Sequence, residues 1–147
     1  ELVGYYTLLD SLQAALLSHK IQDIDENNAE CIENAGLYNR LFMGSPVQAP
    51  AYHEEGNYVY SCYTVLVNDR AKLIEFLDEK GIGYHIPFEL PVHLQPSLAY
   101  LGYQQGAYPV AEDLANRALC LPISSGLKKK DIENIAHTLL EFYGART

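Results

Sequence analysis

Apolar residues recur at helical spacing through the first part of the chain. They fall mostly at steps of three or four residues, the repeat of one helical face: Leu9, Leu12, Leu16, Ile21, Ile24, Ile32 and Ala35. Asp10 and Ser11 supply polar capping groups near the start of this pattern. The spacing predicts one long helix, kinked at a cluster of acidic residues and asparagines at 23–28. Glycine and prolines then predict a loop at 39–50.

A run rich in tyrosine and valine predicts a strand at 58–67. Both of its faces are largely apolar or amphipathic, so we expect the strand to be covered on both sides. Asn68 and Asp69 then supply caps for a short helix, and Gly81 stands where a left-handed residue ends a helix. Residues 82–86 predict a second strand, which gives strand, helix and strand in succession.

Prolines divide the rest of the chain. Those between residues 87 and 96 exclude a long regular element there, whereas Pro109 fits the first turn of a small amphipathic helix. Residues 120–123 predict a short strand. The last helix has the clearest stripe, ended by Gly144: Ile132, Ile135, Ala136, Leu139, Leu140 and Tyr143. Together these elements predict an α+β fold, with a long N-terminal helix and a small, few-stranded sheet with flanking helices.

Composition and charge narrow the choice of partner and compartment. The 147 residues, 48% hydrophobic and 20% charged, fit one globular domain or a part of a larger one. A formal charge of -9 disfavours nucleic acid, and no apolar run approaches the roughly 18 residues of a membrane span. Cys31, Cys62 and Cys120 have no paired spacing, which favours reduced thiols in a cytoplasmic protein. A start at Glu1 fits a piece of a longer protein.

Four stretches occur in an order that resembles a known enzyme family. They are GYYTLLDSLQAA at 4–15, DR at 69–70 leading to GIG at 81–83 and HIP at 85–87, PVHLQP at 91–96 with LGY at 101–103, and YPVAE at 108–112 with LCLP at 119–122 and the closing helix. Together they resemble the C-terminal region of the DegT/DnrJ/StrS aminotransferases, which add amino groups to nucleotide-linked sugars. The resemblance covers essentially the whole chain.

The resemblance implies the small domain of a fold-type-I enzyme dependent on pyridoxal phosphate (PLP). Residues 1–43 would form its long interdomain helix region, and residues 44–147 a small α/β subdomain. The parent enzyme would transfer an amino group to a keto-sugar, usually nucleotide-linked, in amino-sugar, polysaccharide or antibiotic biosynthesis. The implied partners are a sugar-nucleotide, an amino donor and a second copy of the chain, since family members are dimers.

Transamination needs a lysine that binds the cofactor and a carboxylate beside its pyridinium nitrogen. In the family both lie upstream of the stretch that begins at Glu1. The lysines present here stand in polar helical contexts: Lys20, Lys72, Lys80, Lys128, Lys129 and Lys130. We therefore expect PLP in the full-length parent, no catalytic residue in this chain and no transamination by the chain alone.

Three residues are candidates for positions near the substrate or the cofactor. His85 matches a family histidine near the substrate cleft, and an imidazole suits proton transfer or a hydrogen bond to a sugar or phosphate. Tyr6 stands where the family has an asparagine that reaches the neighbouring subunit's cofactor phosphate. Its hydroxyl can still donate, whereas Leu8 cannot replace the guanidinium that follows in the family. His93 is the third candidate; the spacing from His85 to His93 predicts no metal site.

Two other functions stay open at this point. The replacements at Tyr6 and Leu8, with twelve tyrosines in the chain, fit a divergent, cofactor-free binding, regulatory or assembly module of the same fold. The other is an unrelated small α/β binding domain in which the matching stretches arise by chance.

Overall fold

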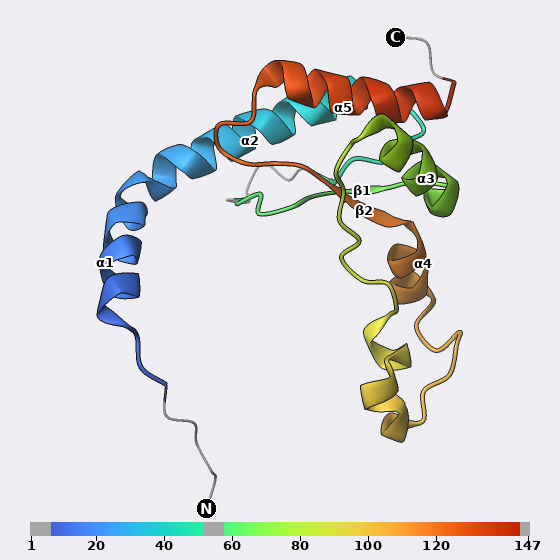
Figure 1. Ribbon diagram of the computed structural model, residues 1–147. Helices are drawn as coiled ribbons and strands as arrows, with labels where there is room; N and C mark the ends of the chain where they lie inside the picture. The colour runs from blue at the N-terminus through green and yellow to red at the C-terminus, as the bar shows by residue number, and fades with distance from the viewer. Residues whose placement is uncertain (1–6, 52–57, 145–147) are drawn as a thin grey trace, which may run out of the picture.

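The structure is a computed structural model that describes residues 7–51 and 58–144 (Figure 1). Within this range the α-helices are α1 (Ser11–Lys20), α2 (Ile24–Leu41), α3 (Arg70–Lys80), α4 (Pro109–Arg117) and α5 (Lys129–Phe142). The strands are β1 (Tyr63–Leu66) and β2 (Ala118–Leu121), and short 3₁₀ helices lie at η1 (Ile21–Asp23), η2 (Val92–Leu94) and η3 (Pro96–Leu101). The predicted α+β class, with its long N-terminal helix, is confirmed.

The long N-terminal helix bends close to the predicted position. Asp10 caps α1, since its Oδ1 accepts hydrogen bonds from the backbone N–H groups of Leu12 at 2.8 Å and Gln13 at 3.4 Å. The 3₁₀ turn η1 separates α1 from α2 at the beginning of the polar cluster at 23–28. Figure 1 shows α1 turning away from the axis of α2 at this point.

The helix α1 lies outside the core. None of its residues is buried, and Leu12 is 70% exposed. The apolar residues on and beside this helix share that exposure: Leu8, Leu9, Leu12, Leu16, Leu17, Ile21 and Ile24. Exposed apolar surface of this extent is typical of an interaction site.

The sheet is small and antiparallel. Thr64 of β1 lies opposite Cys120 of β2, and the ladder covers four residues on each strand. Gln48 pairs with Leu66 on one edge, and His85 pairs with Cys120 on the other, each as an isolated bridge. Two regular strands are therefore flanked by single bridging residues.

The predicted strands are correct in place but differ in extent. The run at 58–67 is regular only over β1, because its partner strand offers four residues. The run at 82–86 is reduced to the bridge at His85. The strand predicted at 120–123 begins two residues earlier and ends before Pro122, which has no N–H to donate to a ladder.

The two faces of β1 differ in burial. Tyr63, Val65 and Val67 are fully buried, as the period-two pattern predicts. On the other face Thr64 is half-buried and Cys62 is exposed. The prediction that both faces are covered is therefore correct for one face only within the described residues.

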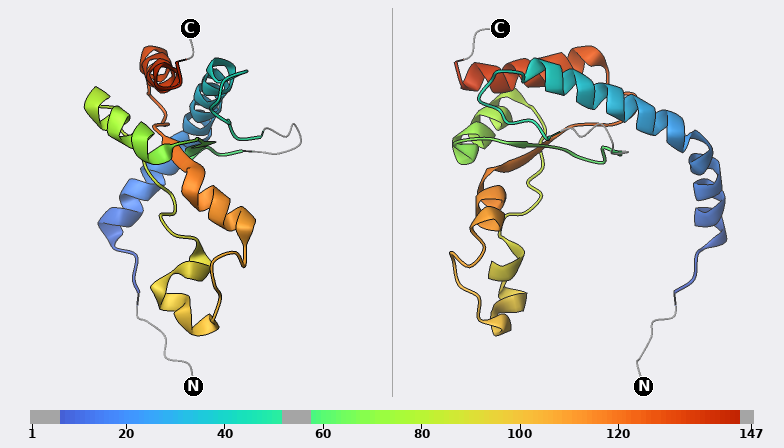
Figure 2. Two further views of the ribbon diagram at one scale, coloured as in Figure 1. Left: turned by 90° about the vertical axis from the view of Figure 1, so that its right-hand side faces the viewer. Right: turned by 180° about the vertical axis from the view of Figure 1, so that it is seen from behind.

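The core lies between the buried face of the sheet and the helices α2, α3 and α5 (Figure 2). Its largest fully buried side chains are Tyr38, Tyr63, Leu73, Leu77, Leu119, Ile132, Leu139, Val65 and Val67. Tyr38 of α2 stacks on Tyr63 with ring centroids 4.7 Å apart. The boundary predicted at residue 43 stays a prediction, and the second half of α2 shares one core with the rest of the chain.

Residues 87–108, called the arm below, extend from the sheet together with α4. Figures 1 and 2 show the arm and α1 both projecting from the side of the sheet opposite α5. Arg70 of α3 ties α4 to the body, since its Nη1 donates to the carbonyl oxygens of Ala115 at 2.6 Å and Ala118 at 3.0 Å. No helix in the described part of the chain is long and apolar enough to cross a membrane.

Candidate functional site

His85 reaches its position through the turn that ends α3. Gly81 adopts a left-handed conformation, with φ of 69°, and the N–H of Ile82 donates to the carbonyl of Leu77 at 2.9 Å. The chain then runs extended to the edge of β2. There the N–H of His85 donates to the carbonyl of Cys120 at 3.0 Å, and the N–H of Cys120 donates back at 2.8 Å. The backbone of His85 is therefore fixed while its side chain stays exposed.

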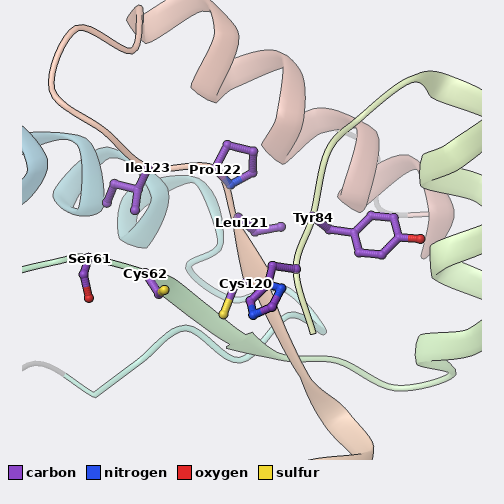
Figure 3. Close-up of a pocket in the computed structure, with 8 residues that line it drawn as sticks. Ser61, Cys62, Tyr84, Cys120, Leu121, Pro122 and Ile123 are labelled. Atoms are coloured by element: carbon purple, nitrogen blue, oxygen red, sulfur yellow. The ribbon is translucent and has the colours of Figure 1, made fainter. Parts of the chain in front are cut away.

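A pocket of about 370 Å³ opens beside His85 on the less covered face of the sheet (Figure 3). Its lining comes from the residues before β1, the end of β2 and the bridging segment: Ser61, Cys62, Tyr84, His85, Cys120, Leu121, Pro122 and Ile123. Tyr84 turns its ring toward α3, where its hydroxyl donates to Oδ2 of Asp78 at 3.1 Å. Partial desolvation and the Asp78 carboxylate raise the pKa of Tyr84.

His93 lies in the arm and does not line this pocket. Its side chain is 8% exposed, and its Nε2 lies 3.0 Å from Oε1 of Glu112 on α4. The Tyr108 ring stands edge-on to the imidazole, with centroids 4.9 Å apart. These contacts give His93 a position within the arm, and its role near a substrate stays a prediction.

The remaining predicted positions lie at the N-terminal end. Tyr6 is outside the residues that the structure describes. Leu8, at the family's arginine position, is 75% exposed and carries no polar group. Among the described residues, the structure therefore does not bring His93 together with His85.

Sequence reasoning did not single out Glu112 or the pair of Cys62 and Cys120. Glu112 stands in the first turn of α4, and its carboxylate accepts hydrogen bonds from the N–H groups of Gly106 and Tyr108. A glutamate in the first turn of a helix that begins with proline is the sequence signal for a side chain that accepts hydrogen bonds from the preceding backbone N–H groups. The two cysteines are 58 residues apart in sequence (120 minus 62), and only the pairing of β1 with β2 brings them together.

The lysines of the chain do not fit a covalent PLP site. All six lie in the described ranges and are exposed. Lys80 pairs with Glu141 at 2.9 Å, and Lys129 pairs with Glu33 at 2.7 Å. Both amines stay in contact with water, whereas a lysine that forms a Schiff base is typically desolvated in an apolar setting. Within residues 7–51 and 58–144, no group of three histidine, cysteine or acidic side chains can hold a metal ion.

A comparison with protein families matches residues 1–140 to the DegT/DnrJ/EryC1/StrS aminotransferase family. The chain belongs to this family. The match covers nearly the whole chain, as the order of the four stretches predicts.

Relatives and solved structures agree with this membership. The chain is 36% identical over 146 residues to the pleiotropic regulatory protein of Geobacillus stearothermophilus. This alignment covers 97% of the chain and 39% of that protein. It is 28% identical to the dTDP-3-amino-3,6-dideoxy-alpha-D-galactopyranose transaminase of Aneurinibacillus thermoaerophilus, covering 92% of the chain and 37% of that enzyme. The crystal structure of DesV from S. venezuelae, in complex with a ketimine intermediate, superposes with a TM-score of 0.88 at 28% identity, covering 95% of the chain and 38% of DesV.

Proposed function

We propose that this chain is the C-terminal domain of a PLP-dependent aminotransferase that transfers an amino group to a nucleotide-linked keto-sugar. The observation that carries the proposal is the family match over residues 1–140, combined with a chain that spans less than two-fifths of the length of its relatives. Relatives named as transaminases of dTDP-linked and UDP-linked amino sugars support the substrate class. Biosynthesis of an amino sugar, for a polysaccharide or an antibiotic, is the setting that we propose.

The exposed surface of the chain supports a place within a larger protein. Apolar residues of α1 have nothing to pack against in the described part of the chain. A second apolar surface lies on the arm and α4: Phe88, Leu90, Val92, Tyr100, Leu101, Val110 and Leu114. We propose that the remaining polypeptide and a second subunit cover these surfaces, which makes the parent a homodimer. We also propose that the parent is a cytoplasmic protein. Sedimentation of the complete gene product tests the dimer.

We assign His85 the role of a substrate contact in the parent. Its backbone N–H and C=O are both hydrogen-bonded to Cys120, so the exposed imidazole projects from a fixed point beside an open pocket. A neutral imidazole both donates and accepts a hydrogen bond, which suits a sugar hydroxyl or a phosphate oxygen. His85 would orient the substrate, and no proton transfer by His85 is required.

The cofactor attachment would come from polypeptide outside this stretch. Because its lysines are exposed, we propose that the chain alone does not transaminate. PLP supplies the group that carries the amino function between donor and acceptor. Borohydride reduction with PLP, followed by peptide mapping, tests this division. A labelled lysine should appear in the complete gene product and none in residues 1–147.

The experiment for the whole proposal is an assay of the complete gene product. Purified protein with PLP, glutamate and a dTDP-linked or UDP-linked keto-sugar should form the amino sugar, detected by mass spectrometry. His85→Ala should raise KM for the sugar-nucleotide by roughly tenfold, the loss of one hydrogen bond to a charged group. His137→Ala, at an exposed position on α5, is the matched control and should leave KM unchanged. Equal KM values for the two variants would exclude His85 as a substrate contact.

A second candidate function is a non-catalytic binding or regulatory module of the same fold. Leu8 favours it, because the family's arginine position offers no guanidinium here, and so does the name of the Geobacillus stearothermophilus relative. The visible absorbance of PLP separates the two functions. If the complete gene product shows no absorbance from bound PLP and forms no amino sugar, the protein is a non-catalytic module and not an aminotransferase.

A further inference from the structure

Two cysteine side chains share the pocket beside His85. Cys120 is on β2, directly opposite Thr64 of β1, and Cys62 is two residues before Thr64. Side chains two residues apart along an extended chain point to the same face. Cys62 and Cys120 therefore face the same side of the sheet, and both line the pocket (Figure 3).

The two thiols differ in exposure. Cys62 is exposed, whereas Cys120 is only 4% exposed and its Sγ lies 3.2 Å from the hydroxyl of Thr64. Burial raises the pKa of the Cys120 thiol, and Cys62 beside it raises the pKa further, while the contact with Thr64 lowers it. The exposed Cys62 is thus the thiol that a dissolved molecule meets first.

The local backbone permits the two sulphurs to approach. A disulfide requires Cα atoms within about 7 Å and Cβ atoms about 4 Å apart, closer than most diagonal neighbours on a sheet. Cys62 precedes the first ladder residue, Tyr63, so its segment can shift without breaking a ladder hydrogen bond. Cys120 is held in place by β1 on one side and by His85 on the other. Closure would therefore move Cys62 toward a fixed Cys120.

We propose that Cys62 and Cys120 form a thiol–disulfide site that is oxidised by a small-molecule disulfide of the glutathione class. The Cys62 thiolate attacks one sulphur of the small disulfide, forming a mixed disulfide and releasing one small thiol. The Cys120 thiolate then attacks the sulphur of Cys62, forming the Cys62–Cys120 bond and releasing the second small thiol. Two electrons pass from the protein to the small disulfide, and the two protons end on the released thiols.

The bond would cross the wall of the pocket next to His85. It would join the segment before β1 to the residue whose backbone positions His85. The site depends on the two thiols alone and holds whether or not the parent protein transaminates. Cys31 on α2 does not line the pocket and takes no part.

Thiol mapping of the purified chain after incubation with oxidised glutathione tests the site. The wild-type chain should lose two of its three alkylatable thiols and two hydrogen atoms of mass, and a cross-linked peptide should join Cys62 to Cys120. Cys120→Ser should stop at a glutathione adduct on Cys62, and Cys62→Ser should form no internal bond. Cys31→Ser is the matched control and should still form the bond, and dithiothreitol should reverse it.

The outcome that overturns the proposal is equally direct. A folded wild-type chain that keeps three alkylatable thiols, or stops at an adduct on Cys62, has no such site. Circular dichroism of each variant shows whether it folds. If Cys120→Ser does not fold, the presence or absence of the cross-linked wild-type peptide decides the question.

Discussion

Glu112 of α4 and His93 of the arm form a contact between two segments that are 19 residues apart in the sequence. Nε2 of His93 in η2 lies 3.0 Å from Oε1 of Glu112 in α4, and the glutamate side chain is 14% exposed. The same carboxylate accepts hydrogen bonds from the N–H groups of Gly106 and Tyr108. One side chain thus closes the arm on the helix that follows it.

Acid should loosen the arm before it unfolds the core. Partial burial pushes the pKa of Glu112 up, but hydrogen bonds from Gly106, Tyr108 and His93 outweigh this and hold it below its ordinary value of 4.5. A folded pKa below the unfolded one gives stability that is complete above pH 4.5 and is lost as pH falls through the folded pKa. The protection factors of the Gly106 and Tyr108 amides, taken relative to intrinsic exchange at each pH, should therefore fall below pH 4.5.

The Glu112→Gln variant tests the cause of this pH dependence. The protection factors of the same amides in this variant should already be low at neutral pH and should not fall further with acid. Asp113→Asn is the control, because the Asp113 side chain is 55% exposed and its carboxylate pairs with Arg117 on the same helix. An acid response that survives in Glu112→Gln would assign the effect to another group.

Tyr38→Phe should destabilise the core through one lost hydrogen bond. The Tyr38 hydroxyl donates to the carbonyl of Pro122 at 3.0 Å, and the residue is fully buried. Phenylalanine keeps the ring that stacks on Tyr63, so the loss is limited to about 0.5–1.5 kcal/mol. Urea unfolding followed by circular dichroism measures it. Tyr100→Phe, at a position 80% exposed, should leave the free energy of unfolding unchanged.

Alkaline solution should destabilise the chain through the same tyrosines. Burial raises the pKa of Tyr38 well above its ordinary value of 10.0, and burial with the neighbouring Tyr60 and Tyr38 does the same for Tyr63. A folded pKa above the unfolded one gives stability that is complete below pH 10.0 and is lost as pH rises toward the folded pKa. The thermal unfolding midpoint should fall above pH 10, and it should fall less in Tyr38→Phe. An equal fall in wild type and variant would contradict this origin.

Asp10→Ala should fray α1 without changing global stability. Asp10 satisfies the backbone N–H of Leu12, and removing such a cap costs a helix about 0.5–2 kcal/mol. Since α1 buries no residue, this cost falls on local opening and not on unfolding of the core. Amide exchange at Leu12 and Gln13 should accelerate while the urea midpoint stays constant. A lowered urea midpoint would show that α1 takes part in the core of the isolated chain.

The helices were accessible from sequence because their signals are local. The stripe from Ile132 to Leu140 predicts α5, and its members are buried in the structure. Gly81 predicts the end of α3, and it adopts the expected left-handed conformation. A helix satisfies its own backbone within four residues, so spacing and caps are sufficient to place it.

The strands were predicted less well because their signals lie elsewhere in the chain. The run at 58–67 has strand composition throughout, yet only β1 is regular. Its partner strand, Ala118–Leu121, offers only four residues for pairing. The run at 82–86 contributes a single bridge for the same reason. The extent of a strand depends on residues dozens of positions away. The local composition of a run does not indicate which distant segment will pair with it.

For the candidate site too, local features could be predicted from the sequence, whereas contacts between distant segments could not. The order of short stretches identified the family and marked His85, because residue type and local order suffice for both. The tertiary structure decided what lies around His85: its backbone pairing with Cys120, the shared pocket of Cys62 and Cys120, and the separate pairing of His93 with Glu112. Contacts between segments distant in sequence depend on which surfaces the whole chain must bury, and that balance is settled only when all the elements pack together.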